Sequence, residues 1–177
     1  MVKEPVGEVY LSAEVIQTRV KELGQNIATD YRGQKLMLVG ILRASFVFMA
    51  DLVRHIDIPL SVGFMAVSSY EGEGGASGAV RILKDLDEPV TGKHILIVED
   101  IIDTGLTLGY LIRHLDARNP QSIKICTLLD RSIRRIVPLP VTYKGFDIPD
   151  IYVVGYGMDY QQLYRNLPSL HLCSVRL

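Results

Sequence analysis

Hydrophobic residues recur in this chain in two patterns, as short continuous runs and as positions three or four residues apart. The continuous runs are rich in β-branched residues, and this is typical of strands buried on both faces of a parallel sheet. They predict strands at 35–42, 60–70, 95–98, 122–130 and 150–157.

Helical spacing appears between these runs. Ser12 can cap a first helix that has Glu14 in its first turn. A second helix is expected after "RAS" (43–45), and a third begins beyond Gly105. Because strands alternate with helices, the sequence predicts an α/β fold with a mostly parallel central sheet flanked by helices. The positions expected to face the core are Ile16, Val20, Leu23 and Ile27 in the first helix, Phe48, Met49, Leu52, Val53 and Ile56 in the second, and Leu108, Leu111, Ile112 and Leu115 in the third.

The segment "EGEGGASG" (71–78) holds four glycines and no large apolar side chain. This composition predicts a mobile loop. Taken alone, the loop could be a slack hairpin or a lid over a site. No repeat or linker divides the chain, so we expect residues 1–177 to form one domain.

Composition narrows the class of protein. The net charge is −1, with 19 basic and 20 acidic residues among 177, and this balance predicts no broad attraction to nucleic acid or membrane. No apolar run approaches the roughly 20 residues that span a bilayer, and the first residues lack the apolar core of a signal peptide. Cys126 and Cys173 are far apart and are expected to be free thiols of a cytoplasmic protein.

The segment "EDIIDTG" (99–105) places three carboxylates at the end of a predicted strand, where α/β proteins bind ligands. "DTG" also occurs in aspartic proteases, but these are all-β proteins that need a second matching aspartate. The motifs of dinucleotide, Walker-type and zinc sites are missing from the sequence. The simplest alternative, that Asp103 or Thr104 only caps the following helix, stays open at this point.

Two features of the same segment fit one chemistry. The residues "DTGLT" (103–107) open a helix with backbone N–H groups, hydroxyls and a positive dipole end, all of which suit a phosphate. Glu99 and Asp100 are hard oxygen ligands that suit Mg²⁺ or ribose hydroxyls. A phosphate pocket beside such acids describes a site for a phosphorylated ribose.

Together these stretches resemble the type I phosphoribosyltransferases. "ILIVEDIIDTGLTL" (95–108) resembles their phosphoribosyl-diphosphate signature, and "GILRASFVFMADLVRHI" (40–56) is similar to their diphosphate loop. "SSY" (68–70) before the glycines looks like their flexible catalytic loop. "LLDRSIRR" (128–135) and "GFDIPDIYVVGYGMDYQQLYRNLP" (145–168) resemble the purine-recognition and C-terminal segments of the hypoxanthine-guanine branch. The resemblance runs from about residue 8 to 170.

The resemblance implies a type I phosphoribosyltransferase fold with a small hood formed by the terminal segments. It implies a purine salvage enzyme that moves the 5-phosphoribosyl group from phosphoribosyl diphosphate to hypoxanthine or guanine, giving IMP or GMP and diphosphate. It also implies Mg²⁺ as cofactor and a homo-oligomer of two or four copies.

For the sugar, the resemblance assigns Glu99 and Asp100 to the ribose hydroxyls and a Mg²⁺. Asp103 is assigned as the general base beside purine N7, a role that helps N–C bond formation at an oxocarbenium-like sugar. The residues expected to hold the 5-phosphate are Thr104, Gly105, Thr107 and, through its backbone N–H, Leu106.

For the diphosphate, the resemblance assigns Arg43, Ala44 and Arg165, with Ser69 and Tyr70 on the closing loop. Relatives usually have glycine where this chain has Ala44, and the Arg43–Ala44 bond is expected to be cis. The alanine Cβ is expected to crowd the diphosphate.

For the base, Arg131 is assigned to the purine 6-oxo group, Tyr152 to stacking and Val153 to main-chain contact with the base edge. Asp159 lies beside the base and is assigned to a second Mg²⁺, so that Glu99, Asp100 and Asp159 are the expected metal ligands. Relatives usually have lysine at Arg131. This departure suggests a base choice shifted toward xanthine as one alternative. The other is a regulator that senses phosphoribosyl diphosphate, which the even charge balance disfavours.

Overall fold

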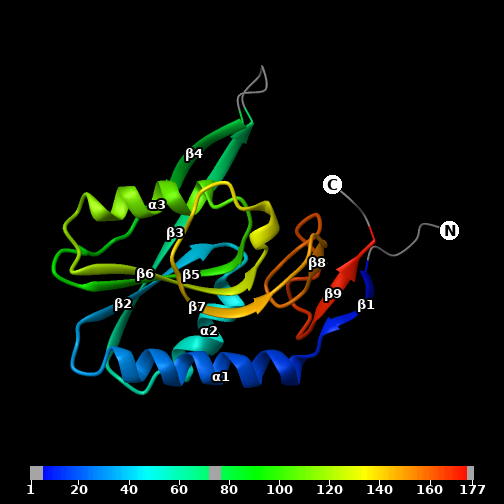
Figure 1. Cartoon of the computed structure of the whole chain (residues 1–177), viewed down its shortest axis with the longest axis horizontal. Coiled ribbons are helices and arrows are strands. Elements are labelled where there is room, and N and C mark those ends of the chain that lie inside the picture. The colour runs from blue at the N-terminus through cyan, green and yellow to red at the C-terminus, as the bar shows by residue number, and fades with distance from the viewer. Residues whose placement is uncertain (1–5, 72–76, 175–177) are drawn as a thin grey trace.

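The computed structural model describes residues 6–71 and 77–174, and its main layer is a six-stranded sheet (Figure 1). The strand order is β4-β3-β2-β5-β6-β7, and every pair is parallel except β3 with β4. The predicted mostly parallel α/β fold is therefore confirmed. The strands are β2 (Leu36–Leu42), β3 (Leu60–Glu71), β4 (Ser77–Lys84), β5 (His94–Ile102), β6 (Ser122–Asp130) and β7 (Val141–Asp147).

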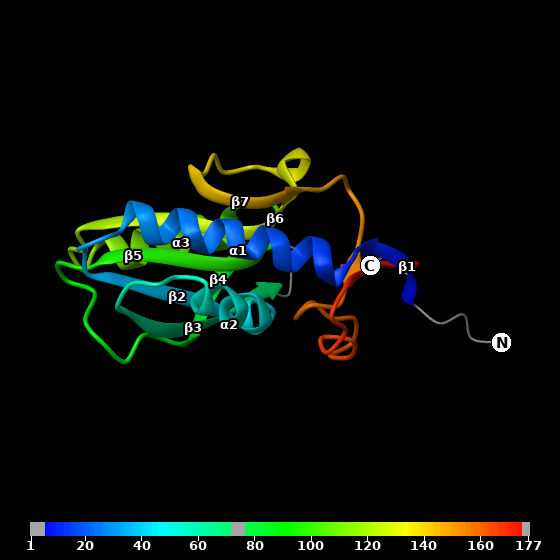
Figure 2. The ribbon, with the colours of Figure 1, turned by 90° about the horizontal axis from the view of Figure 1, so that it is seen from below.

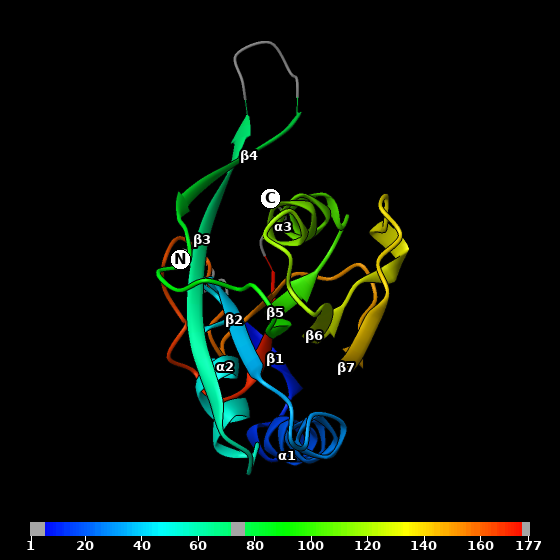
Figure 3. The same ribbon diagram turned by 90° about the vertical axis from the view of Figure 1, so that its left-hand side faces the viewer.

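Helices cover both faces of this sheet (Figure 3). α1 (Ala13–Asp30) and α2 (Phe46–Arg54) pack on one face, and α3 (Leu106–Asp116) packs on the other. Because side chains alternate along a strand, β5 contributes to both cores. Its Ile95 and Ile97 pack with the α3 cluster, and its Leu96 and Val98 pack with the α1–α2 cluster.

The helix boundaries follow the predicted signals. Ser12 is the N-cap of α1, and its hydroxyl accepts a hydrogen bond from the Val15 N–H at 3.4 Å. α2 ends at Arg54, so the buried Ile56 lies just beyond the helix rather than inside it. Across 6–71 and 77–174, no helix combines the length and the apolar character needed to cross a membrane.

A second, three-stranded sheet contains the two ends of the described chain (Figure 1), which lie on the same side of the molecule in Figure 2. β1 (Val6–Leu11) pairs antiparallel with β9 (Leu170–Cys173), which pairs antiparallel with β8 (Val153–Val154). This sheet is the small hood expected from the terminal segments.

The strand predicted at 150–157 is mostly wrong. Only Val153–Val154 is a strand, and it belongs to the small sheet rather than the large one. Gly155 and Gly157 have φ of +102° and +96°, and Tyr156 between them has φ of +48°. These left-handed conformations turn the chain away after Val154.

The glycine-rich loop predicted at 71–78 is shorter than expected. β3 extends to Glu71 and β4 begins at Ser77, and these two residues pair across the hairpin. Residues 72–76 lie outside the described part of the chain. β4 and β7 were not predicted, because both are edge strands whose polar residues, such as Arg81 and Lys144, interrupt the apolar pattern.

Both cysteines are free thiols, as expected. Cys126 is buried in the core, and burial raises the pKa of its thiol. Cys173, in β9, is half-buried.

Close packing of α1 on the end of α2 depends on Gly24. A Cβ added at Gly24 would lie 2.5 Å from the Cβ and 2.8 Å from the carbonyl oxygen of His55. We expect Gly24→Ala to lower the free energy of unfolding by about 1–3 kcal/mol, because the helices must separate to relieve the overlap. Urea unfolding of the variant measures this. Asn26→Ala, on the exposed side of the same helix, is the control and should be neutral or slightly stabilising. Equal stability of the two variants would contradict the packing argument.

Candidate active site

The carboxyl ends of the parallel strands form the edge where the predicted site residues lie. β5 runs through Ile102, and Glu99 pairs in parallel register with Thr127 of β6. Glu99 and Asp100 are therefore strand residues, whereas the strand predicted from the sequence ended at residue 98. The pairing with β2 ends at Val98, so it is pairing with β6 that holds the backbone around the two acids, and Asp103, Thr104 and Gly105 form the turn into α3.

The two adjacent acids share an unusual environment. Asp100 is 8% exposed, and burial raises its pKa to about 6 although the charge of Arg165 acts in the opposite direction. Burial and the neighbouring Asp100 raise the pKa of Glu99 well above its ordinary value. A buried carboxyl group beside a half-buried one favours holding a proton or a cation between them. They are suitable oxygen donors for a hard cation.

The turn into α3 has the geometry of an anion site. Gly105 is the N-cap of α3 with φ of +81°, and a Cβ there would lie 2.9 Å from the carbonyl oxygen of Val137. The Thr104 carbonyl accepts hydrogen bonds from the N–H groups of Ile136 at 2.9 Å and Val137 at 3.0 Å. Leu106 is exposed at the first position of the helix. These hydrogen bonds hold the turn against the segment after β6. The backbone N–H groups at the start of α3 have no partner within the helix and can bind an anion.

Arg131 contacts Asp103, the carboxylate that was predicted to act as the general base. Its side chain is 8% exposed, and its Nη1 donates to Asp103 Oδ2 at 3.3 Å. Its Nη2 donates to the carbonyl oxygen of Ile151. Within the described residues, Asp103 Oδ1 and Arg131 Nε are buried with no hydrogen-bond partner. An unpaired acceptor and an unpaired donor therefore lie close together and suit a polar ligand.

One further residue of this cluster was missed by the sequence analysis. Arg134 Nη1 lies 3.7 Å from Asp103 Oδ2, and its Nη2 lies 2.7 Å from Asp150 Oδ1. The short 3₁₀ helix Ser132–Arg134 brings Arg134 back to Asp103. The three-residue spacing from Arg131 in "RSIRR" was the available signal.

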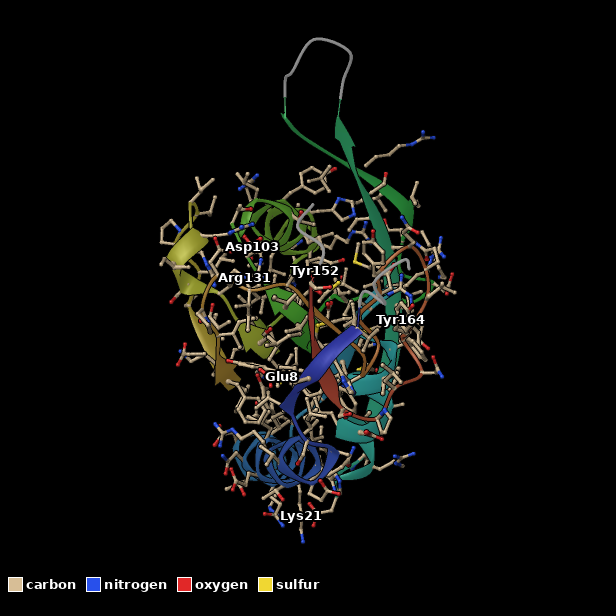
Figure 4. All side chains as sticks on the ribbon, turned by 90° about the vertical axis from the view of Figure 1, so that its right-hand side faces the viewer. Glu8, Lys21, Asp103, Arg131, Tyr152 and Tyr164 are labelled. Carbon is tan, nitrogen blue, oxygen red and sulfur yellow. The ribbon has the colours of Figure 1, made fainter. Side chains whose placement is uncertain are left out.

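A cleft of about 220 Å³ joins most of the predicted base and metal residues. Figure 4 shows Asp103, Arg131 and Tyr152 between α3 and the small sheet. The Tyr152 hydroxyl donates to the Asp159 carbonyl oxygen at 2.7 Å, which holds the ring against the loop after β8. The cleft is lined by Ala44, Asp100, Ile101, Asp103, Arg131, Tyr152, Val153, Met158 and Asp159.

A larger cavity of about 790 Å³ adjoins this cleft and shares Asp103, Arg131 and Tyr152 with it. Its other wall comes from β1 and β9, including Glu8 and Cys173 (Figure 4). The small sheet therefore forms part of the wall around the site.

The loop after β2 lies against the loop after β8. The Leu42–Arg43 peptide bond is cis, one position before the Arg43–Ala44 bond that was expected to be cis. A Cβ added at Gly157, which has φ of +96°, would overlap the Ala44 carbonyl oxygen at 2.1 Å. Glycine at 157 therefore permits this close approach.

Two arginines predicted to bind diphosphate meet at this contact. Arg165 donates to the Gly157 carbonyl at 2.8 Å and forms an ion pair with Asp159 at 2.6 Å. Arg43 and Arg165 both donate to Gln162 Oε1, at 2.9 and 3.0 Å. Gln162 was not singled out from the sequence.

Ser69 and Tyr70, which were predicted to lie on the closing loop, are described by their backbone alone. Their backbones pair within β3–β4, with Val80 and Ala79, and their side chains lie outside the described part of the structure. Thr107 lies in the first turn of α3, half-buried and next to the phosphate turn.

No group of three or more His, Cys, Asp or Glu side chains within the described ranges could hold a metal ion by itself. Asp100 and Asp159 line the same cleft, but Asp159 accepts from Arg165 and from the Gln162 N–H, so both of its oxygens have partners. Glu99 does not line the cleft. These residues fit a cation that takes only one or two carboxylates and completes its shell from water and substrate, as Mg²⁺ does.

Comparison with known proteins identifies the family. Residues 8–161 match the family model described as "Phosphoribosyl transferase domain". The chain is 51% identical over 163 residues to the hypoxanthine phosphoribosyltransferase of Salmonella typhimurium (91% of this chain, 92% of the relative). It is 48% identical over 170 residues to the hypoxanthine-guanine phosphoribosyltransferase of Bacillus subtilis (96% and 94%). The crystal structure of a Staphylococcus aureus hypoxanthine phosphoribosyltransferase superposes with a TM-score of 0.91 at 46% identity, covering 96% of this chain and 92% of that one. The chain belongs to the phosphoribosyltransferase family and has its type I fold.

Proposed function

We propose that this enzyme transfers the 5-phosphoribosyl group from phosphoribosyl diphosphate to hypoxanthine or guanine, releasing diphosphate. The observation that carries the proposal is that Asp103, Arg131 and Tyr152 line one cleft and that this cleft lies beside the N-terminus of α3. The relatives that bear this activity in their names support it. The relatives give no support to the regulator or to the xanthine-directed enzyme.

The direct test is an assay of each purine with phosphoribosyl diphosphate and Mg²⁺. Hypoxanthine and guanine should yield IMP and GMP together with equimolar diphosphate. The absence of nucleotide from both bases would overturn the proposal.

In the proposed mechanism, Asp103 takes the proton from purine N7 as N9 attacks the anomeric carbon and the bond to diphosphate breaks. The two oxygens of Asp103 have different partners. Oδ2 accepts a hydrogen bond from Arg131, which orients the carboxylate, while Oδ1 has no partner in the described structure and is the oxygen suited to take the proton. Arg134, tied to Asp150, adds a second positive charge near the carboxylate. The N–H groups at the start of α3 are suited to the 5-phosphate.

Mg²⁺ would be held by Asp100 on the sugar side and by Asp159 on the diphosphate side, with Glu99 supporting the first position. When bound, it neutralises charge that develops on the departing diphosphate. Arg43 and Arg165 are suited to the same anion. Ser69 and Tyr70 remain proposed for closing over the site.

We also propose that the whole chain works as one domain, because the small sheet supplies a wall to the cavity at the edge of the large one. The remaining proposals are a cytoplasmic location and a homo-oligomer of two or four copies, both of which rest on the family.

The role of Asp103 predicts a large kinetic effect. Asp103→Asn should lower kcat with hypoxanthine by about 10²-fold or more, the usual scale for losing a general base. Asp116→Asn, an exposed carboxylate at the end of α3, makes the same chemical change outside the site and should leave kcat unchanged. Initial rates of IMP formation measure both. Turnover near that of the parent enzyme in Asp103→Asn would remove it from the role of base.

The buried Arg131 predicts the choice of base. A guanidinium group has only donors, so it pairs with a 6-oxo group and leaves a 6-amino group unpaired. Adenine should therefore have a kcat/KM at least about 10²-fold below that of hypoxanthine.

Substitutions at Arg131 distinguish its role in choosing the base from the role of Tyr152 and Val153, which line the same cleft. Arg131→Ala should lower kcat/KM for hypoxanthine by about tenfold or more, whereas Arg131→Lys should change the ranking of oxopurines without admitting adenine. Arg113→Ala, on the exposed side of α3, is the control. If Arg131→Ala leaves the kinetics with hypoxanthine and guanine unchanged, then Tyr152 and Val153 choose the base without Arg131.

The raised pKa of Asp100 predicts a pH-dependent cost to stability. Its folded-state pKa of about 6 exceeds the ordinary value of 3.8, so the folded protein binds this proton more tightly than the unfolded chain. The stability that the group contributes is present below pH 3.8 and is lost as pH rises to about 6. At pH 7.5 without Mg²⁺, Asp100→Asn should therefore be more stable than the parent protein by about 1–3 kcal/mol.

Urea unfolding at pH 7.5 and pH 4.5 tests this expectation. The stabilisation by Asp100→Asn should shrink at the lower pH, and Asp116→Asn is the matched control. A destabilised Asp100→Asn at pH 7.5 would mean that the carboxylate is not under electrostatic strain.

A further inference from the structure

Gln162 contacts three residues that the proposed function assigns to the diphosphate. Its side-chain oxygen Oε1 accepts a hydrogen bond from Arg43 Nη1 at 2.9 Å and from Arg165 Nη2 at 3.0 Å. Its backbone N–H donates to Asp159 Oδ2 at 2.8 Å. One residue therefore connects the loop after β2 with the loop after β8.

The backbone of Gln162 is held in a conformation that does not suit its residue type. Its φ is +67°, and the preceding Gln161 has φ of +51°. Glycine would adopt this conformation at little cost, and Asn and Asp are the side chains that tolerate it best. Two contacts support glutamine here, the N–H bond to Asp159 and the bonds of Oε1 to two arginines. Only the second depends on the side chain.

The shared oxygen fixes the spacing of two positive groups. Because one atom lies 2.9 Å from Arg43 Nη1 and 3.0 Å from Arg165 Nη2, those two nitrogens are at most about 6 Å apart. Two guanidinium groups repel each other at this distance, and a neutral acceptor between them offsets that repulsion without cancelling their charge. Within the described residues, Gln162 is the one hydrogen-bond partner of the exposed Arg43 side chain.

We propose that Gln162 is a positioning residue that orients Arg43 and Arg165 toward the diphosphate group of the substrate. This inference rests on the proposed function and adds a residue to it. Side chains as flexible as arginine lose conformational freedom when they bind an anion, and a prior hydrogen bond removes part of that cost. Because the acceptor is neutral, it adds no negative charge beyond the one that Asp159 already places beside Arg165, and a second carboxylate there would repel the diphosphate.

The test compares Gln162→Met with Gln161→Met. Methionine keeps the length of glutamine and removes the acceptor. Gln161 has the same left-handed backbone, but in the described part of the chain its side chain makes a single hydrogen bond, to the Tyr160 hydroxyl at 3.4 Å, so its variant controls for strain and for loss of an amide. The readouts are KM for phosphoribosyl diphosphate, KM for hypoxanthine, and the calorimetric Kd values of diphosphate and IMP in the presence of Mg²⁺.

We expect Gln162→Met to raise KM for phosphoribosyl diphosphate and Kd for diphosphate by about tenfold, the scale for hydrogen bonds to charged groups. KM for hypoxanthine and Kd for IMP should change by less than about twofold, because those ligands do not need the two arginines. Gln161→Met should match the parent protein. Equal effects of the two variants, equal losses for diphosphate and IMP, or tighter diphosphate binding in Gln162→Met would each overturn the inference.

A second pair of variants guards against misfolding of the first. Gln162→Glu keeps an acceptor but adds charge, and it should weaken diphosphate more than Gln161→Glu does. Diphosphate affinity equal to that of the parent protein in Gln162→Glu would also overturn the inference. The two proposals fail in different experiments. If the proposed function is wrong, the parent protein forms no nucleotide in the purine assay. If only the role of Gln162 is wrong, the parent protein is active and the variants bind diphosphate as it does.

Discussion

Parallel pairing of β5 with β2 on one side and β6 on the other is the constraint on which the site depends. Up to Val98 the backbone polar groups of β5 are satisfied on both edges, and beyond it the pairing with β6 continues, so the charged side chains at the end of the sheet lie on a fixed backbone. Asp100 is held there in a buried position that opposes its ionisation. The stability lost at Asp100 is offset by the apolar residues of the same strand, Ile95 to Val98, which are fully buried in the two cores.

The segments around this edge hold one another in place. The carbonyl of Thr104 binds the chain after β6, and Arg131 at the end of β6 binds both Asp103 and the Ile151 carbonyl. On the other side, Gly157 allows the loop after β8 to touch the loop after β2. The groups proposed for phosphate, base and diphosphate are thus positioned by bonds between loops rather than by any single element. A change in one loop should reach the others through these contacts.

Much of the large sheet could be predicted, because β2, β3, β5 and β6 are continuous apolar runs and the three helices have regular apolar faces. The edge strands β4 and β7 could not, since solvent exposure breaks their pattern. The resemblance named most of the residues that line the cleft, among them Asp103, Arg131 and Tyr152, but not Ile101 or Met158. It did not reveal Arg134 or Gln162, whose contacts form across gaps of 31 and 119 residues in the chain and depend on a 3₁₀ turn and on left-handed backbone. Apart from the three-residue spacing of Arg131 and Arg134, no local sequence pattern points to these long-range contacts.

The small sheet has a consequence for how the protein is made. β9 is the middle strand of that sheet, and without it neither β1 nor β8 has a pairing partner there. During translation, β1 is therefore synthesised first and waits for Leu170–Cys173, some 160 residues later. The large sheet can assemble beforehand, but the wall formed by Glu8, Leu172 and Cys173 cannot. A nascent chain that has not yet reached Leu170 should therefore have the core of the fold and yet lack a closed binding cavity.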